Sequence, residues 1–179
     1  MNLALKISSW IDSLNKGFGV IATWMVLLAC LVSAGNASFR YVFSNSSNAW
    51  LEIQWYMFSA IFLLGAAYTL KVNEHVRVDI IYANLPPRGR LWVDSIGVVL
   101  FLLPATVMLS IMTWPFFWEA WARNEISSNA GGLPRWPVKL LLPVGFAMLS
   151  LQGISELIKR IAALRGTIEV ETNYEKPLQ

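Results

Sequence analysis

The chain has 179 residues, of which 56% are hydrophobic and 14% are charged, and its formal net charge is +3. Soluble domains usually have about 25% charged residues, so this composition, with a mean hydropathy of +0.51, indicates a membrane protein. The basic balance does not indicate nucleic-acid binding. Lys and Arg stand beside long apolar stretches, so membrane lipid is the expected partner of these charges.

Four apolar stretches are each about as long as the roughly 20 residues that an α-helix needs to cross the hydrocarbon core. They cover residues 17–39, 50–70, 96–118 and 138–157. We therefore predict an all-α membrane protein with four transmembrane helices. A single membrane domain is expected over residues 1–166, followed by a polar C-terminal tail at 167–179.

Residues 1–16 have the pattern of an amphipathic helix. One face carries Leu3, Ile7, Trp10, Ile11 and Leu14, and the other carries Lys6, Ser9, Asp12, Ser13 and Lys16. Such a helix is expected to lie in the membrane interface, with Trp10 at the depth of the headgroups. A disordered N-terminal end is the alternative.

Span one contains Ala29, Ser33 and Ala37 at every fourth position. Rows of small residues let membrane helices approach closely, so this row predicts a helix contact, with ordinary membrane composition as the alternative. Arg40 ends the span, and the polar run at 44–48 predicts a turn with capping residues. Span two then begins with a carboxylate and an amide, Glu52 and Gln54.

The connector between spans two and three is polar and is broken by the prolines at 86–87. Before the break, residues 72–83 carry apolar side chains at helical spacing, and we predict a short interfacial helix there. An isolated strand also fits the alternation, but it would lack a partner. His75 and Asp79 have i, i+4 spacing on this helix, and Arg77 lies between them.

Prolines interrupt the later spans. Span three contains Pro104 and Pro115, and span four contains Pro143. Proline is tolerated in membrane helices because neighbouring groups re-satisfy the freed carbonyls, so we predict kinks at these positions. The third connector, at 119–137, contains two glycines and two prolines.

Lys and Arg are more frequent on one predicted side of the membrane. The N-terminal segment, the second connector and the C-terminal side hold ten of them. The opposite side holds four, which are Arg40, Arg123, Arg135 and Lys139. The positive-inside rule therefore predicts that both termini lie in the cytoplasm.

Few residues are candidates for chemistry. The centres of the four spans carry no charge, whereas a channel or pump ordinarily needs polar groups across the membrane depth. Cys30 and His75 are each the single residue of their type, so neither has a partner for a Cys- or His-based metal site. We predict no enzyme activity and no cofactor in this chain.

Several short runs follow one another in a distinctive order. They are RYVF at 40–43, Glu52, NEHVRVD at 73–79, EISS at 125–128, LPRWP at 133–137, LPVGF at 142–146 and LQG at 151–153. In this order they resemble the small membrane subunit of TRAP (tripartite ATP-independent periplasmic) transporters, from about Phe18 to Gly166. The run from His75 to Asp79 is the most specific element.

The resemblance implies a non-catalytic subunit in a bacterial inner membrane. In such a system a periplasmic binding protein captures an organic anion, typically a carboxylate. A large elevator-type subunit then moves the anion, driven by a gradient of an ion, usually sodium, that this large subunit would bind. The small subunit would be a fixed scaffold for the large one.

Two sets of residues are candidates for these contacts. Structural or subunit-interface candidates are Ala29, Ser33, Ala37, Arg40, Glu52, Gln54, His75, Arg77 and Asp79. Candidates for docking the binding protein are Arg123, Glu125, Arg135 and Trp136. The alternatives to this function are an assembly or regulatory subunit of another multi-component transporter and a small independent channel.

Overall fold

The computed structural model describes residues 2–44, 47–75 and 85–168. Its elements are α1 (Asn2–Phe43), α2 (Asn48–Lys71), α4 (Pro87–Gly97), the π-helix η1 (Val98–Leu102), α5 (Leu103–Ala122) and α6 (Trp136–Leu164). Four helical stretches are long and apolar enough to cross a membrane, namely Leu3–Phe43, Asn48–Lys71, Pro87–Ala122 and Trp136–Leu164. The predicted all-α class with four candidate spans is thereby confirmed.

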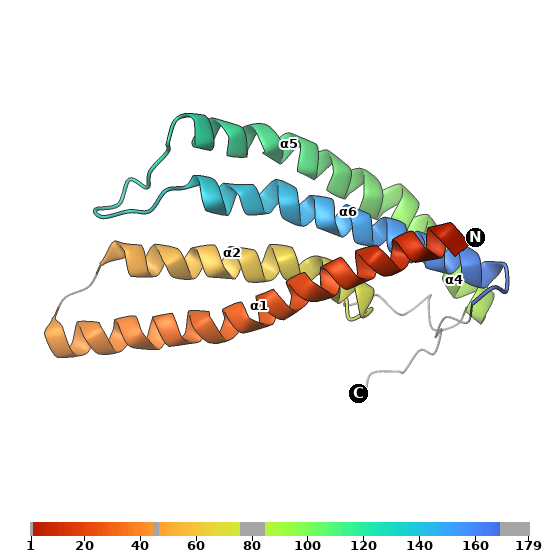
Figure 1. The fold of residues 1–179 in the computed structure, drawn as a ribbon, viewed down its shortest axis with the longest axis horizontal. Coiled ribbons are helices and arrows are strands. Elements are labelled where there is room, and N and C mark those ends of the chain that lie inside the picture. The colour runs from red at the N-terminus through yellow and green to blue at the C-terminus, as the bar shows by residue number, and fades with distance from the viewer. Residues whose placement is uncertain (1, 45–46, 76–84, 169–179) are drawn as a thin grey trace.

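The four long helices lie in the order α5, α6, α2, α1 across the molecule (Figure 1). The contacts follow this order, because α6 packs against both α5 and α2, and α2 packs against α1. α1 runs diagonally and also contacts α6. We call the end where α1 begins and α6 ends the terminal end, and the opposite end the loop end.

Three helices end where asparagine or glycine adopts a left-handed backbone conformation. α2 is followed by Asn73 (φ 61°), α5 by Asn124 (φ 48°) and α6 by Gly166 (φ 70°). After each helix, backbone N–H groups turn back to the last free carbonyls, as in a Schellman motif; Glu74 N, for example, donates to Thr69 O at 3.2 Å. At the start of α2, the predicted capping turn supplies Ser47, whose Oγ accepts from Ala49 N.

α1 is one uninterrupted helix of 42 residues. At 1.5 Å per residue it is about 63 Å long, roughly twice the thickness of the hydrocarbon core. The predicted N-terminal helix is therefore continuous with span one and not a separate element. In the second connector, Val72 to His75 form a turn and a bend, and the rest of the predicted interfacial helix, residues 76–83, lies outside the described residues.

The prolines have different local effects. Before Pro104 the helix widens to the π-helix η1, in which Leu103 N donates to Val98 O. A wider turn makes room for a ring that would otherwise meet the carbonyl four residues back. α5 and α6, in contrast, continue through Pro115 and Pro143.

Small side chains bring α2 and α6 together. A Cβ added to Gly145 would lie 2.8 Å from Leu63 Cβ and 3.0 Å from its carbonyl oxygen, so the α6 backbone rests directly on α2. Around this crossing, Ala60, Leu64, Ala67 and Met148 form a small apolar core. The contact between α2 and α6 therefore depends on close backbone approach at small residues.

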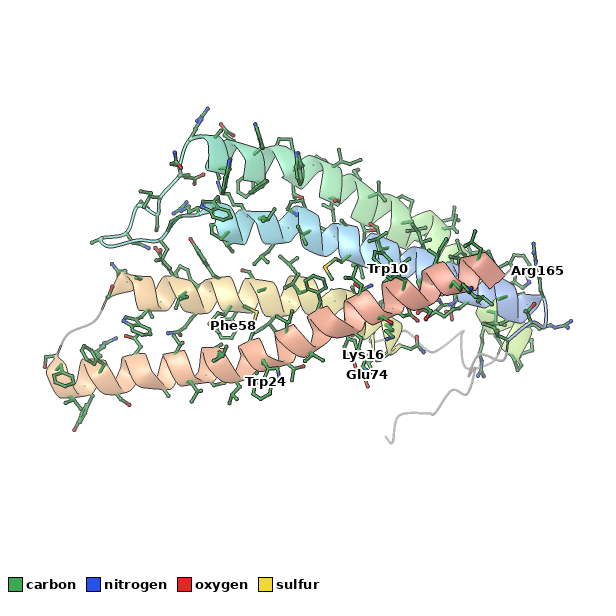
Figure 2. The ribbon with its side chains drawn as sticks, viewed as in Figure 1. Trp10, Lys16, Trp24, Phe58, Glu74 and Arg165 are labelled. Atoms are coloured by element: carbon green, nitrogen blue, oxygen red, sulfur yellow. The ribbon has the colours of Figure 1, made fainter. Side chains whose placement is uncertain are left out.

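The outward faces of the helices carry bulky apolar side chains. Trp24 on α1 and Phe58 on α2 are 62% and 56% exposed (Figure 2), and Phe101 in η1 is 73% exposed. Exposed apolar surface of this extent fits lipid or a membrane partner.

Candidate functional sites at the two ends of the bundle

At the loop end, the carboxylate of Glu52 holds the connector between α5 and α6. Its Oε1 accepts hydrogen bonds from Ser127 Oγ and from Asn129 Nδ2 (2.8 Å), and its Oε2 accepts one from Leu133 N (2.7 Å). Glu52 is itself 4% exposed. One side chain in the first turns of α2 therefore fixes three points of a loop about 80 residues further along the chain.

The loop is also closed on itself. Ser127 N donates to Leu133 O at 3.0 Å, and Arg135 N donates to Glu125 O at 2.9 Å. Gly132 is packed so tightly that an added Cβ would lie 2.5 Å from Ser127 Cβ. α2 supports the loop at a further point, where Tyr56 Oη donates to Pro134 O at 2.9 Å.

The charges of the loop are paired with one another. Lys139 donates to the Glu125 carboxylate and lies 4.0 Å from the centre of the Phe116 ring. Arg135 Nη1 lies 3.6 Å from Glu125 Oε1. The hydrogen bond from Lys139, with the positive charges of Lys139 and Arg135, holds the pKa of Glu125 below its ordinary value of 4.5. Arg123 pairs with Glu119 at 2.8 Å on the surface.

A cavity of about 340 Å³ lies beneath the loop between α2, α5 and α6. Its wall includes Glu52, Tyr56 and Phe116 together with Arg135 and Lys139. All three of its charged side chains, Glu52, Arg135 and Lys139, already have partners. The geometry therefore fits a stabilised loop, and it leaves no wall charge for a ligand.

At the terminal end, polar side chains join α1 to α6. The carboxylate of Asp12 accepts hydrogen bonds from Gln152 Nε2 (2.9 Å), Ser155 Oγ (2.8 Å) and Lys159 Nζ (3.1 Å). Next to it, Asn15 Nδ2 donates to Gln152 Oε1 at 2.7 Å. Ser8 and Ser155 share a hydrogen bond of 2.7 Å.

Further charges extend this group toward α4 and α2. Arg160 Nη1 donates to Glu156 Oε2 at 3.0 Å, and its Nε lies 3.5 Å from Asp94 Oδ2 on α4. Lys71 Nζ, at the end of α2, donates to the backbone carbonyl of Asp12 at 2.9 Å. We call the whole group the polar cluster; its members are Ser8, Asp12, Asn15, Lys71, Asp94, Gln152, Ser155, Glu156, Lys159 and Arg160. It links all four long helical stretches at one end.

The predicted interface residues are distributed over both ends and the outer face. Ala29 is buried, whereas Ser33, Ala37 and Arg40 are exposed, so the small-residue row is only partly buried inside this chain. Gln54 is buried in the first turns of α2, and His75 is exposed. Arg77 and Asp79 lie outside the described residues.

The predicted docking residues are closer together. Arg123 and Glu125 follow α5, and Arg135 and Trp136 precede or begin α6, so all four belong to the same loop or its edges. Trp136 packs edge-on against Trp121, with ring centroids 4.6 Å apart. Their function in docking stays a prediction.

Sequence reasoning did not identify the polar cluster. It placed Asp12 on the polar face of the N-terminal helix and did not single out any polar residue of span four as a candidate. A signal was present, because Ser8, Asp12 and Asn15 have helical spacing, and Gln152, Ser155, Glu156 and Lys159 have it too. Two polar stripes of this kind, one on each of two apolar helices, fit a helix–helix contact.

These features define a multi-pass membrane protein whose polar side chains fix its own helices and one connecting loop. Residues 28–163 match the family described as "Tripartite ATP-independent periplasmic transporters, DctQ component", and the chain belongs to this family. It is therefore a transport subunit, the small permease of a TRAP system, and not an enzyme.

Two relatives support the assignment. A Haemophilus influenzae protein described as a TRAP transporter small permease is 23% identical over 161 residues, covering 87% of this chain and 95% of that protein. The Vibrio cholerae "C4-dicarboxylate TRAP transporter small permease protein DctQ" is 27% identical over 168 residues, covering 82% of this chain and 71% of that protein. No solved structure matches this chain.

Proposed function

We propose that this chain is the fixed scaffold for the large membrane subunit of a secondary-active uptake system for organic anions. The substrate class is taken from the resemblance to TRAP transporters and from the C4-dicarboxylate named for the Vibrio cholerae relative. Carboxylates are therefore the proposed substrates. The coupling ion, sodium, is proposed to bind to the large subunit.

One observation carries the scaffold function, and it concerns α6. Polar side chains bind α6 to α1 through the polar cluster and to α5 through Ser150, whose Oγ donates to Thr106 Oγ1 at 2.7 Å. α2 meets α6 at the close contact of Gly145 with Leu63. A scaffold must resist the motion of its partner, and helices joined in this way form a rigid unit with apolar outer faces.

Reconstitution into proteoliposomes tests this proposal. The chain, the large subunit and the binding protein are combined, with a labelled C4-dicarboxylate and an inward sodium gradient. Uptake is expected only when all three proteins are present. Uptake by the chain alone would contradict the proposal and favour an independent channel, and full uptake without the chain would favour an assembly or regulatory subunit.

We further propose that the loop between α5 and α6 helps to dock the periplasmic binding protein. Glu52 and Tyr56 hold this loop from below, and a loop held in this way presents a fixed surface without ordering on contact. Arg123 is exposed beside it, and Arg135 is partly exposed. Both arginines have glutamate partners in this chain, but these pairs are exposed or partly exposed and so contribute little, which lets an acidic patch on the partner compete for them.

Charge and ring substitutions test the docking proposal. Arg135→Gln combined with Trp136→Ala is expected to weaken binding of the binding protein and to reduce uptake, with the assembly of the two membrane subunits unchanged. Lys16→Gln, an exposed cation nearer the terminal end, is the matched control. Unchanged uptake together with unchanged binding in the double variant would show that this loop is not the docking surface.

The proposed orientation places both termini in the cytoplasm. The start of α1 and the end of α6 lie at the same end of the bundle (Figure 1), as an even number of spans requires. In a Cys30→Ser background, a cysteine at Ser128 should react with an impermeant maleimide added outside, and a cysteine at Thr167 should not. The reverse pattern would invert the orientation.

A further inference from the structure

A groove of about 590 Å³ lies at the terminal end, between α4 with η1 and the last turns of α6. Its floor is apolar and consists of Ile96, Val99, Leu100, Leu157, Ile161 and Leu164. The volume is in the range of ligand-binding pockets. The π-helix contributes directly, because Val99 and Leu100 belong to η1, and π-helical turns are frequent at functional sites.

The mouth of the groove differs chemically from its floor. Arg165 and Trp92 also line the groove. Both are exposed, so we take them as its mouth, and Arg165 lies at the terminal end in Figure 2. Arg88 precedes Trp92 by four residues on α4 and therefore lies on the same helix face. Both arginines are exposed, and within residues 2–44, 47–75 and 85–168 neither has an acidic partner.

We propose that this groove is a binding site for one anionic phospholipid of the leaflet at the terminal end. The phosphate would be held between Arg88 and Arg165, and an acyl chain would lie on the floor toward Val99 and Leu157. The proposal does not depend on the identity of the transported substrate.

Charge and polarity favour this occupant over the others. A helix of a partner protein would cover the apolar floor but would leave two guanidinium groups without anions at the mouth. Free phosphate would satisfy the arginines but would leave the floor uncovered. A phospholipid matches both parts. The indole ring of Trp92 also suits this occupant, because tryptophan is enriched at the headgroup level of membranes.

Native mass spectrometry of the purified full chain tests the site. The chain is released from detergent after incubation with phosphatidylglycerol or phosphatidylcholine, and retained lipid is counted. One retained phosphatidylglycerol is expected in preference to phosphatidylcholine. Arg88→Gln and Arg165→Gln should each reduce this preference about fivefold, since a basic residue near an anionic lipid surface contributes about that factor.

Two further variants separate the site from general charge and from free phosphate. Arg123→Gln removes an exposed arginine at the loop end and should leave the retention unchanged. Ile161→Trp fills the floor and should abolish retention while both arginines remain. The proposal is overturned if the double variant Arg88→Gln/Arg165→Gln retains phosphatidylglycerol as the parent does, or if inorganic phosphate displaces the lipid completely.

Discussion

Asn15 on α1 and Gln152 on α6 are separated by 137 positions in the chain, yet Asn15 Nδ2 donates to Gln152 Oε1 at 2.7 Å. Both side chains have no exposed surface. A buried amide pair in an apolar bundle favours the helix faces that bring the two amides together, because rotating either helix away would leave Asn15 Nδ2 and Gln152 Oε1 buried without each other. The N-terminal part of α1 is therefore held on α6 and is not free to lie elsewhere on the membrane surface.

A double-mutant cycle measures this contact. Asn15→Leu and Gln152→Leu should each destabilise the bundle by about 1–3 kcal/mol. Asn15→Leu leaves the buried Gln152 Oε1 without its donor, and Gln152→Leu leaves Asn15 Nδ2 unpaired and also removes the hydrogen bond to Asp12. The double variant should lose less than the sum, with a coupling energy of about 0.6–1.7 kcal/mol, as for other membrane hydrogen bonds. Reversible unfolding in mixed detergent micelles gives these free energies.

Ser38→Leu is the control, since it makes the same kind of polar-to-apolar change on an exposed face of α1. It should leave the free energy of unfolding nearly unchanged. Strictly additive losses at Asn15 and Gln152 would show that the hydrogen bond contributes nothing of its own.

A second prediction concerns the loop held by Glu52. In Glu52→Ala, the amide of Leu133 and the side chains of Ser127 and Asn129 lose their shared acceptor. Amide hydrogen exchange across residues 125–135 is therefore expected to become faster by at least tenfold, with the centres of the helices unaffected, because local opening is governed by such contacts. Mass spectrometry of peptides from the labelled protein measures this.

Glu119→Ala is the matched control for that experiment. It removes a carboxylate close to the same loop. Both side chains of its salt bridge with Arg123 are exposed, and such pairs contribute little to stability. Equal exchange in the two variants would mean that the loop is held by its own turns and not by Glu52.

The sequence predicts the spans well and the contacts between them poorly, for physical reasons. Length and hydropathy decide whether a helix crosses lipid. Both are local properties of the sequence, so the four spans can be predicted from it. The partner of Asp12 is a residue 140 positions or more away, and no local pattern says whether a polar stripe meets water or a second stripe. Glu52 stood out as an early carboxylate in span two, but its loop partners depend on how the connector folds back.

Helix packing gives a third prediction. Gly145→Ala should destabilise the bundle by about 1–3 kcal/mol, because the new methyl group meets the backbone of Leu63, which cannot move like a flexible side chain. Gly35→Ala in α1 is the control, since nothing lies within 4 Å of an added Cβ there. This control should be neutral or stabilising by up to about 1 kcal/mol, from helix propensity alone. Destabilisation of similar size in both variants would contradict the close α2–α6 contact.

The fourth prediction concerns the acid side of the pH range. The pKa of Glu125 lies below 4.5 mainly because Lys139 donates a hydrogen bond to its carboxylate. The positive charges of Lys139 and Arg135 lower this pKa further. Because the folded pKa is the lower one, the contact stabilises the loop above pH 4.5 and is lost as the pH falls through the folded value. Carboxyl carbon NMR of labelled glutamate should therefore show Glu125 titrating below the ordinary glutamate value of 4.5. Lys139→Met should move the pKa of Glu125 upward toward 4.5. If the pKa of Glu125 is the same with and without this substitution, Lys139 is not what lowers it.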